Sequence, residues 1–206
     1  MGVDKARLPA RLDGQWWPLA IRVRRVVAAA GLDPVILRRG APDGLPWTDP
    51  GQGAVEVVFE PDDGEPHPLW GVATALEGGG DVVVVSCDLP GITAASIRAV
   101  ADAPAPAVAF DGIRVHPLIG HYPANWAARA RAFALAGRSV RDFAADASRV
   151  TVDAAAVANA NRPEDLDRGP LAELASALGF LEPGALERAL AGERRRLRQR
   201  GVVAVM

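Results

Sequence analysis

The feature that most constrains the fold is a five-residue run, Val82–Ser86, that consists almost entirely of valine. The run does not alternate between polar and apolar positions, which is typical of a strand covered on both faces, as in a parallel sheet packed between helices. Asp88 follows it, and then Pro90 and Gly91, which cannot continue a central strand. Because open α/β sheets bind ligands at the carboxyl ends of their strands, Asp88 is a candidate ligand for a metal or a substrate. A role confined to shaping the turn explains this aspartate equally well.

Helices and strands alternate along the rest of the chain, which predicts a doubly wound, mostly parallel sheet with helices on both faces. Apolar residues recur at helical spacing from Leu19, and Gly31 is placed to end that helix. Asp111-Gly112, between two apolar runs, indicates a β-hairpin with a two-residue turn. Residues 1–15 are polar, and we predict them to be irregular. The remaining predictions are strands at 34–37, 55–59, 107–110, 113–119 and 150–152, helices at 70–78, 93–102 (capped by Thr93) and 124–136, and a short helix capped by Ser139.

Length and charge narrow the classes of protein to which the chain can belong. Its 206 residues can bury the core of one α/β domain, which we place at 1–168, and residues 169–206 are predicted to form a helical extension. The formal net charge of −2 gives no basic surface of the kind that wraps nucleic acid. No segment reaches the apolar length of a membrane span. We therefore expect a cytoplasmic protein that binds neither nucleic acid nor membranes.

The single cysteine, Cys87, excludes an internal disulfide framework and a site built from several cysteines. We expect it to be a small buried hydrophobic residue.

Six short motifs occur in a fixed order along residues 1–167: Met1-Gly2-Val3-Asp4-Lys5-Ala6, Pro68-Leu69-Trp70-Gly71, Cys87-Asp88-Leu89-Pro90, His116-Pro117-Leu118, Gly137-Arg138-Ser139-Val140-Arg141-Asp142 and Asn159-Ala160-Asn161-Arg162-Pro163-Glu164-Asp165-Leu166. Any one of them is a weak signal. Together, in this order, they resemble the molybdenum cofactor guanylyltransferase family, the MobA-like nucleotidyltransferases, which have a Rossmann-like fold.

This resemblance implies that GMP is transferred from GTP to molybdopterin cofactor, with Mg²⁺ present and pyrophosphate released. Asp88 would then hold Mg²⁺ and act in catalysis, and Lys5 would act in catalysis by pairing with nucleotide phosphates. The carboxylate that contacts the nucleotide is Asp62 or Asp63, between which the loop spacing does not decide. The residues implied to bind the acidic co-substrate are His116, Arg138, Asn159 and Asn161, and Arg141 could assist or simply decorate a helix. A protein that delivers the cofactor and molybdoenzymes that accept it are implied partners.

The chain departs from the family pattern most at its start. The Gly-Gly-x-Ser-x-Arg half of the signature, which supplies backbone N–H groups to phosphates, does not precede Met1, and neither does the usual first strand. Because that strand would lie centrally, we expect an unpaired edge and a gap in the core. Two explanations are open: Met1 is an internal methionine of a longer protein, or the protein is a degenerate relative that binds without catalysis.

Three smaller departures affect the choice of nucleotide. His67 and Trp70 add bulk where the family has small residues close to a nucleotide, and Arg162 replaces a threonine. A cytidylyltransferase of the same superfamily that uses CTP is therefore the alternative to a guanylyltransferase.

Overall fold

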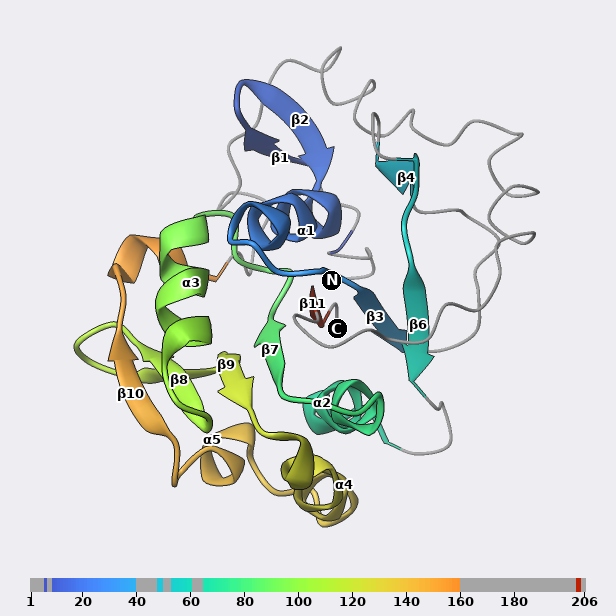
Figure 1. The fold of residues 1–206 in the computed structure, drawn as a ribbon, viewed down its shortest axis with the longest axis vertical. Coiled ribbons are helices and arrows are strands. Elements are labelled where there is room, and N and C mark those ends of the chain that lie inside the picture. Colours follow the sequence, from blue (N-terminus) through green and yellow to red (C-terminus); the bar gives the residue numbers. More distant parts are fainter. Residues whose placement is uncertain are drawn as a thin grey trace.

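The computed structural model describes residues 6, 9–39, 48–49, 53–60, 65–159 and 203–204, which form an open α/β arrangement (Figure 1). The strands are β1 Pro9–Leu12, β2 Gln15–Pro18, β3 Ile36–Arg39, β4 Thr48–Asp49, β5 Gly53–Ala54, β6 Val57–Glu60, β7 Val82–Val85, β8 Ala107–Phe110, β9 Val115–Tyr122, β10 Ser148–Thr151 and β11 Val203–Ala204. The helices are α1 Leu19–Ala29, α2 Pro68–Glu77, α3 Ala94–Asp102, α4 Ala127–Leu135 and α5 Val140–Phe143, with 3-10 turns at Ala124–Trp126 and Ala154–Val157. No helix in these described ranges has the length and apolarity needed to cross a membrane.

The strands that form the centre of the fold belong to two sheets, one in the order β10-β8-β9-β7 and the other in the order β11-β3-β6. The pairs β10–β8, β11–β3 and β3–β6 are parallel, whereas β9 runs antiparallel to both β7 and β8. The predicted α/β class and the predicted antiparallel strand are both confirmed.

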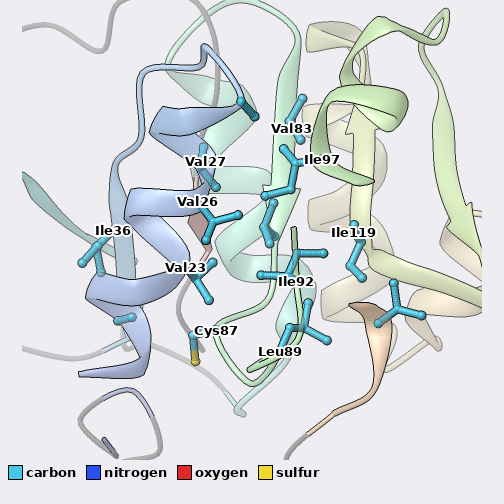
Figure 2. Close-up of a cluster of buried hydrophobic side chains, with 14 of the residues drawn as sticks. Val23, Val26, Val27, Ile36, Val83, Cys87, Leu89, Ile92, Ile97 and Ile119 are labelled. Carbon is cyan, nitrogen blue, oxygen red and sulfur yellow. The ribbon is translucent and has the colours of Figure 1, made fainter. Parts of the chain in front are cut away.

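The valine run is buried on both faces, as its composition predicted. Val83 and Val85 belong to the apolar core that they share with α1 and α3, whereas Val82 and Val84 belong to a second core shared with α2 and α4. Figure 2 shows the first of these cores, in which Val83 lies near side chains from both α1 and α3. Because full burial of one valine is worth about 1.5–3 kcal/mol, β7 anchors both faces of its sheet. Cys87 is also buried in the first core, which confirms that prediction.

Strand β11 occupies the place where we expected an unpaired edge. Val203 pairs with Ile36 and Ala204 with Leu37 in parallel register, on the side of β3 opposite to β6. The same two residues lie against β7, α1 and α2, so β11 stands between the two sheets (Figure 1). The expected gap was therefore wrong at this position, because a strand from far along the chain takes it. The remainder of the predicted helical extension, 169–206, lies outside the described residues.

The segment before α1 is the other part of the fold that differs from expectation. Residues 9–18, most of which we predicted to be irregular, form the antiparallel hairpin β1–β2. Asp13 and Gly14 have φ values of 52° and 80°, which are the two positive values that a tight two-residue hairpin turn needs. The prediction failed because polar and charged residues surround this turn and hide the strand pattern.

The residues that cap the N-termini of helices were predicted more reliably from the sequence. The side chain of Thr93 accepts a hydrogen bond from the N–H of Ser96 (3.2 Å), and that of Ser139 accepts one from the N–H of Asp142 (3.0 Å). Both predicted helix caps are thereby confirmed.

Candidate functional site

Asp88 lies just beyond the end of β7, and two side chains from separate parts of the chain hold its carboxylate. The hydroxyl of Ser86 donates to Oδ1 (2.5 Å), and Nδ2 of Asn159 donates to Oδ2 (3.2 Å). The structure therefore brings together two of the sequence motifs, those that contain Asp88 and Asn159. A carboxylate has about four lone-pair positions, so these two bonds leave acceptor capacity for a further ligand.

A cavity of about 350 Å³ lies next to the residues that hold this carboxylate, and Asp88 itself is not among the residues that line it. Ser86 and Asn159, the two donors to Asp88, both line it, as does Leu89. Its remaining lining residues are Arg114, Val115, His116, Pro117, Leu118, Ile119, Arg141 and Ala158. The lining thus combines apolar side chains with cationic and amide groups.

The first half of β9 forms one wall of the cavity because it is bulged away from β8. Gly120 pairs with Val108, but the next pair joins His116 to Ala109, so Pro117 and its two successors have no partner on β8. Proline lacks an N–H group and is tolerated at such a bulge. The buried phenol of Tyr122 donates to the carbonyl of Pro117 (2.6 Å) and fixes the bulge from inside.

His116, one of the predicted site residues, is held by Asp111 across the hairpin loop. Its Nε2 lies 2.8 Å from Oδ2 of Asp111, and its side chain is only 10% exposed. Hydrogen bonds from the N–H of Arg114, the ring of His116 and the N–H of Ile113 keep the pKa of Asp111 well below its ordinary value. Asp111 is therefore a fixed negative charge that orients the imidazole ring at the cavity wall.

The loop that contains Asp111 is longer than predicted. It spans residues 111–114, and β9 begins only at Val115, because the carboxylate of Asp111 accepts the N–H groups of Ile113 (2.8 Å) and Arg114 (2.7 Å). The predicted two-residue turn was wrong in length, although the hairpin itself is present.

The two arginines of the fifth motif have different positions. Arg138 lies beyond the end of α4 with its guanidinium 4.1 Å from the ring centre of Phe133, and it is not among the residues that line the cavity. Arg141, on the exposed face of α5, does line it. Within the described part of the chain, the guanidinium of Arg141 makes no hydrogen bond or ion pair. Arg141 is therefore the better placed of the two cations to bind an anion in the cavity.

His67 and Trp70, which we expected to crowd a nucleotide, have structural roles. Nδ1 of His67 accepts the N–H of Leu69 (3.2 Å) and caps α2. Trp70 packs against the second core and lies under the guanidinium of Arg131. Neither residue lines the cavity.

Four predicted site residues, Lys5, Asp62, Asp63 and Asn161, lie outside the described residues. The sequence motifs do not include Ser86, Asp111 or Arg114. Ser86 stands two positions before Asp88 at a strand end, a spacing at which a hydroxyl can reach a carboxylate, and the Asp-Gly pattern at Asp111 predicts only a turn.

The residues around Asp88 fit the chemistry of Mg²⁺. Among the described residues, no three histidine, cysteine or carboxylate side chains gather in a way that could hold a metal ion by themselves. Mg²⁺ does not need such a cage, since it commonly binds one or two carboxylates and completes its shell with water and substrate phosphates. Asp88, with free acceptor capacity and with both of its donors in the wall of a cavity, suits that mode.

Comparisons with known proteins give a consistent result. A search of curated proteins found no match. The crystal structure of molybdopterin-guanine dinucleotide biosynthesis protein A from Archaeoglobus fulgidus is similar to this chain, with a TM-score of 0.55 at 15% identity, over 86% of this chain and 90% of that one. The match to the crystal structure of a protein from Aquifex aeolicus VF5 has 22% identity and a TM-score of 0.46. It covers 52% of this chain and 63% of the Aquifex protein, which is less than two thirds of that protein.

The sequence itself matches a family model, described as the MobA-like NTP transferase domain, over residues 1–152. That range includes β1 to β10, Asp88 and most of the cavity wall. The chain therefore belongs to the MobA-like NTP transferase family.

Proposed function

We propose that the protein transfers GMP from GTP to molybdopterin cofactor and releases pyrophosphate. One observation carries the proposal most directly: Asn159 donates a hydrogen bond to Asp88 and also lines, together with His116, a single cavity. These three residues come from three separate motifs that the chain shares with guanylyltransferases. The fold similarity to the Archaeoglobus fulgidus protein, whose name refers to biosynthesis of the molybdopterin-guanine dinucleotide, agrees with this proposal.

Nucleotidyl transfer depends mainly on positioning phosphates and offsetting their charge. A phosphate oxygen of the co-substrate forms a bond to the α-phosphorus of GTP, and the bond to the pyrophosphate leaving group breaks. Bound Mg²⁺ would supply positive charge that offsets the charge of the reacting phosphates. Asp88 would hold the ion, and the hydrogen bonds from Ser86 and Asn159 would keep its carboxylate in one orientation.

The cavity suits a flat heterocycle that carries an acidic group. Leu89, Val115 and Leu118 offer apolar contact, while Arg141 offers a guanidinium that no described carboxylate neutralises. An arginine can bind a phosphate through two parallel hydrogen bonds. Molybdopterin combines a pterin ring system with a phosphate, which matches both features. A protein that delivers this cofactor and molybdoenzymes that accept the product are the partners that this activity requires.

The test is to incubate the purified protein with Mg²⁺, molybdopterin and either GTP or CTP, and to detect products by mass spectrometry together with pyrophosphate release. We expect the guanine dinucleotide to form, with pyrophosphate in equal amount, and CTP to give little product. A product formed only from CTP would identify a cytidylyltransferase instead. Absence of product from both nucleotides, with folding confirmed by circular dichroism and molybdopterin still bound, would identify a binding protein without catalysis.

A further inference from the structure

The loop that carries Asp88 is held by an arginine that belongs to none of the sequence motifs. Arg22 lies on α1 and is only 7% exposed. Its Nη1 donates to the carbonyl of Leu89 (3.2 Å) and its Nη2 to the carbonyl of Ile92 (3.3 Å). These two carbonyls bracket the turn that immediately follows Asp88, so one rigid guanidinium spans the turn.

The contact between Arg22 and the loop is deep in the protein. Leu89 and Ile92 are each 1% exposed and belong to the same core as Val23 and Val26 of α1; Figure 2 shows these side chains together. Burial lowers the pKa of Arg22, an effect that the charge of Asp13 opposes. Because a buried charge is costly unless it is hydrogen-bonded, any shift of the loop away from this guanidinium is strongly disfavoured.

The opposite side of the loop is also confined. A Cβ atom added to Gly91 would lie 2.3 Å from the carbonyl oxygen of Ala155, so the loop backbone presses on the 3-10 turn Ala154–Val157. That turn leads directly to Asn159, which donates to Asp88. The loop therefore lies between α1 on one side and the segment that supplies a donor to Asp88 on the other.

We propose that Arg22 is a positioning residue, which fixes the Asp88 loop through the carbonyls of Leu89 and Ile92 so that the carboxylate is held ready for a divalent cation. This inference rests on the proposed function, in which Asp88 holds the metal. Lysine cannot replace Arg22 fully, because an ammonium group is a point charge and lacks the planar fork that reaches both carbonyls.

Arg98, an exposed residue of α3, provides a control that also bonds to α1. Its Nε donates to the carbonyl of Ala30 (3.3 Å) and its Nη2 to that of Ala29 (3.2 Å), at the far end of α1 from the Asp88 loop. Arg98 therefore makes the same kind of two-carbonyl contact between α3 and α1 but does not touch the loop. Its loss should lower stability without changing the metal site.

The experiment compares the full-length protein with its Arg22→Met, Arg22→Lys and Arg98→Met variants. Mn²⁺, in the presence of GTP, is the probe for metal binding, measured by electron paramagnetic resonance, and hydrogen–deuterium exchange follows the amides of residues 87–92. We expect Arg22→Met to weaken Mn²⁺ binding by up to roughly 10-fold, the lower end of the range for a direct outer partner of a metal ligand, because Arg22 holds the loop and not Asp88 itself. The same variant should speed exchange in the loop. Arg22→Lys should be intermediate, and Arg98→Met should match the wild type in both measurements.

Two results would overturn the inference. One is that the Arg22 variants keep the Mn²⁺ affinity and the loop exchange rates of the wild type. If Arg22→Met does not fold, the result for Arg22→Lys decides. The other is an equal loss of Mn²⁺ affinity in Arg98→Met, which would indicate a general effect of lower stability.

Asp88→Asn separates this inference from the proposed function. If Asp88→Asn abolishes Mn²⁺ binding while the Arg22 variants keep it, the positioning role alone fails. If Asp88→Asn also binds Mn²⁺ normally, the metal assignment fails and both proposals fall.

Discussion

Asp88 and Asp111 occupy comparable positions but are bonded in different ways. Asp88 follows β7 and Asp111 follows β8, the two strands that flank β9. The carboxylate of Asp111 accepts hydrogen bonds from two backbone N–H groups and is bonded to the ring of His116, and all three partners lie within five residues of it in sequence. Asp88 instead accepts two side-chain donors, one of which lies far along the chain.

This difference separates a structural carboxylate from a candidate functional one. Two partners of Asp111, the N–H groups of Ile113 and Arg114, belong to its own hairpin loop, and such bonds are typical of a carboxylate that shapes a turn. The third partner, His116, lies at the start of β9, only five residues away. The partners of Asp88 include Asn159, which is distant in sequence and which no local turn requires. We therefore expect Asp88 to govern turnover and Asp111 to govern the stability of its hairpin.

The largest effect should come from Asp88→Asn, which removes the charge that would hold the metal. We expect turnover to fall at least about 100-fold, because electrostatic stabilisation through a metal contributes several kcal/mol. The unfolding temperature should change little, since Asp88 is half exposed and outside the core. Steady-state kinetics and thermal unfolding of the same preparation check both statements, and near-normal turnover would contradict the assignment of Asp88.

Asn159→Ala should have a smaller effect, because the hydroxyl of Ser86 still holds the other oxygen of Asp88. We expect the apparent Mg²⁺ constant to weaken about 10-fold, as for other outer partners of metal ligands. Asn125→Ala is the matched control, since Asn125 is exposed on the 3-10 turn Ala124–Trp126 and is not a cavity residue. Equal Mg²⁺ dependence in the two variants would show that Asn159 does not orient Asp88.

The smallest effect on turnover should come from Asp111→Asn, which keeps the shape of the side chain but removes its charge. Because the folded state lowers the pKa of Asp111 below its ordinary value of 3.8, the stability that its charge contributes is fully present above about that pH. It is lost as the pH falls further, through the pKa of the folded state.

Urea unfolding of the wild type and of Asp111→Asn between pH 7 and pH 2.5 tests this expectation. The variant should be less stable at neutral pH, and the difference should shrink as the solution becomes more acidic than pH 4. A difference that stays constant with pH would show that the charge of Asp111 does not stabilise the hairpin.

Much of the fold was predictable because its signals are local. A few neighbouring residues are enough to predict the buried strand β7, the helix α1 and the helix caps Thr93 and Ser139. Two of the four Asp-Gly pairs in the sequence show the limit of such signals. Asp13-Gly14 forms the tight two-residue turn that we had assigned to Asp111-Gly112, because side-chain bonding by Asp111 extends its own loop.

The site was predictable only in part, for a related physical reason. The position of Asp88 follows from the strand that precedes it, but its meeting with Asn159 is a tertiary contact that no spacing reveals. The roles of Arg138 and Arg141 depend on where α5 begins. Since Ser139 caps that helix, Arg138 precedes it and stacks on Phe133, whereas Arg141 lies within α5 and reaches the cavity. The contact of Arg22 with the Asp88 loop has no sequence signal, since the loop groups that it reaches are backbone carbonyls.

The position of β11 has a consequence for the order of events during synthesis. A ribosome makes β3 and β7 long before it makes Val203 and Ala204, so the place between the two sheets stays open while the intervening chain is added. Contacts between residues so far apart in sequence form late, because a long loop must close first. Until then the facing edges of β3 and β7 are exposed to other chains. The step most open to misassembly is therefore the pairing of β11 with β3, which comes after the other described strands of both sheets have been made.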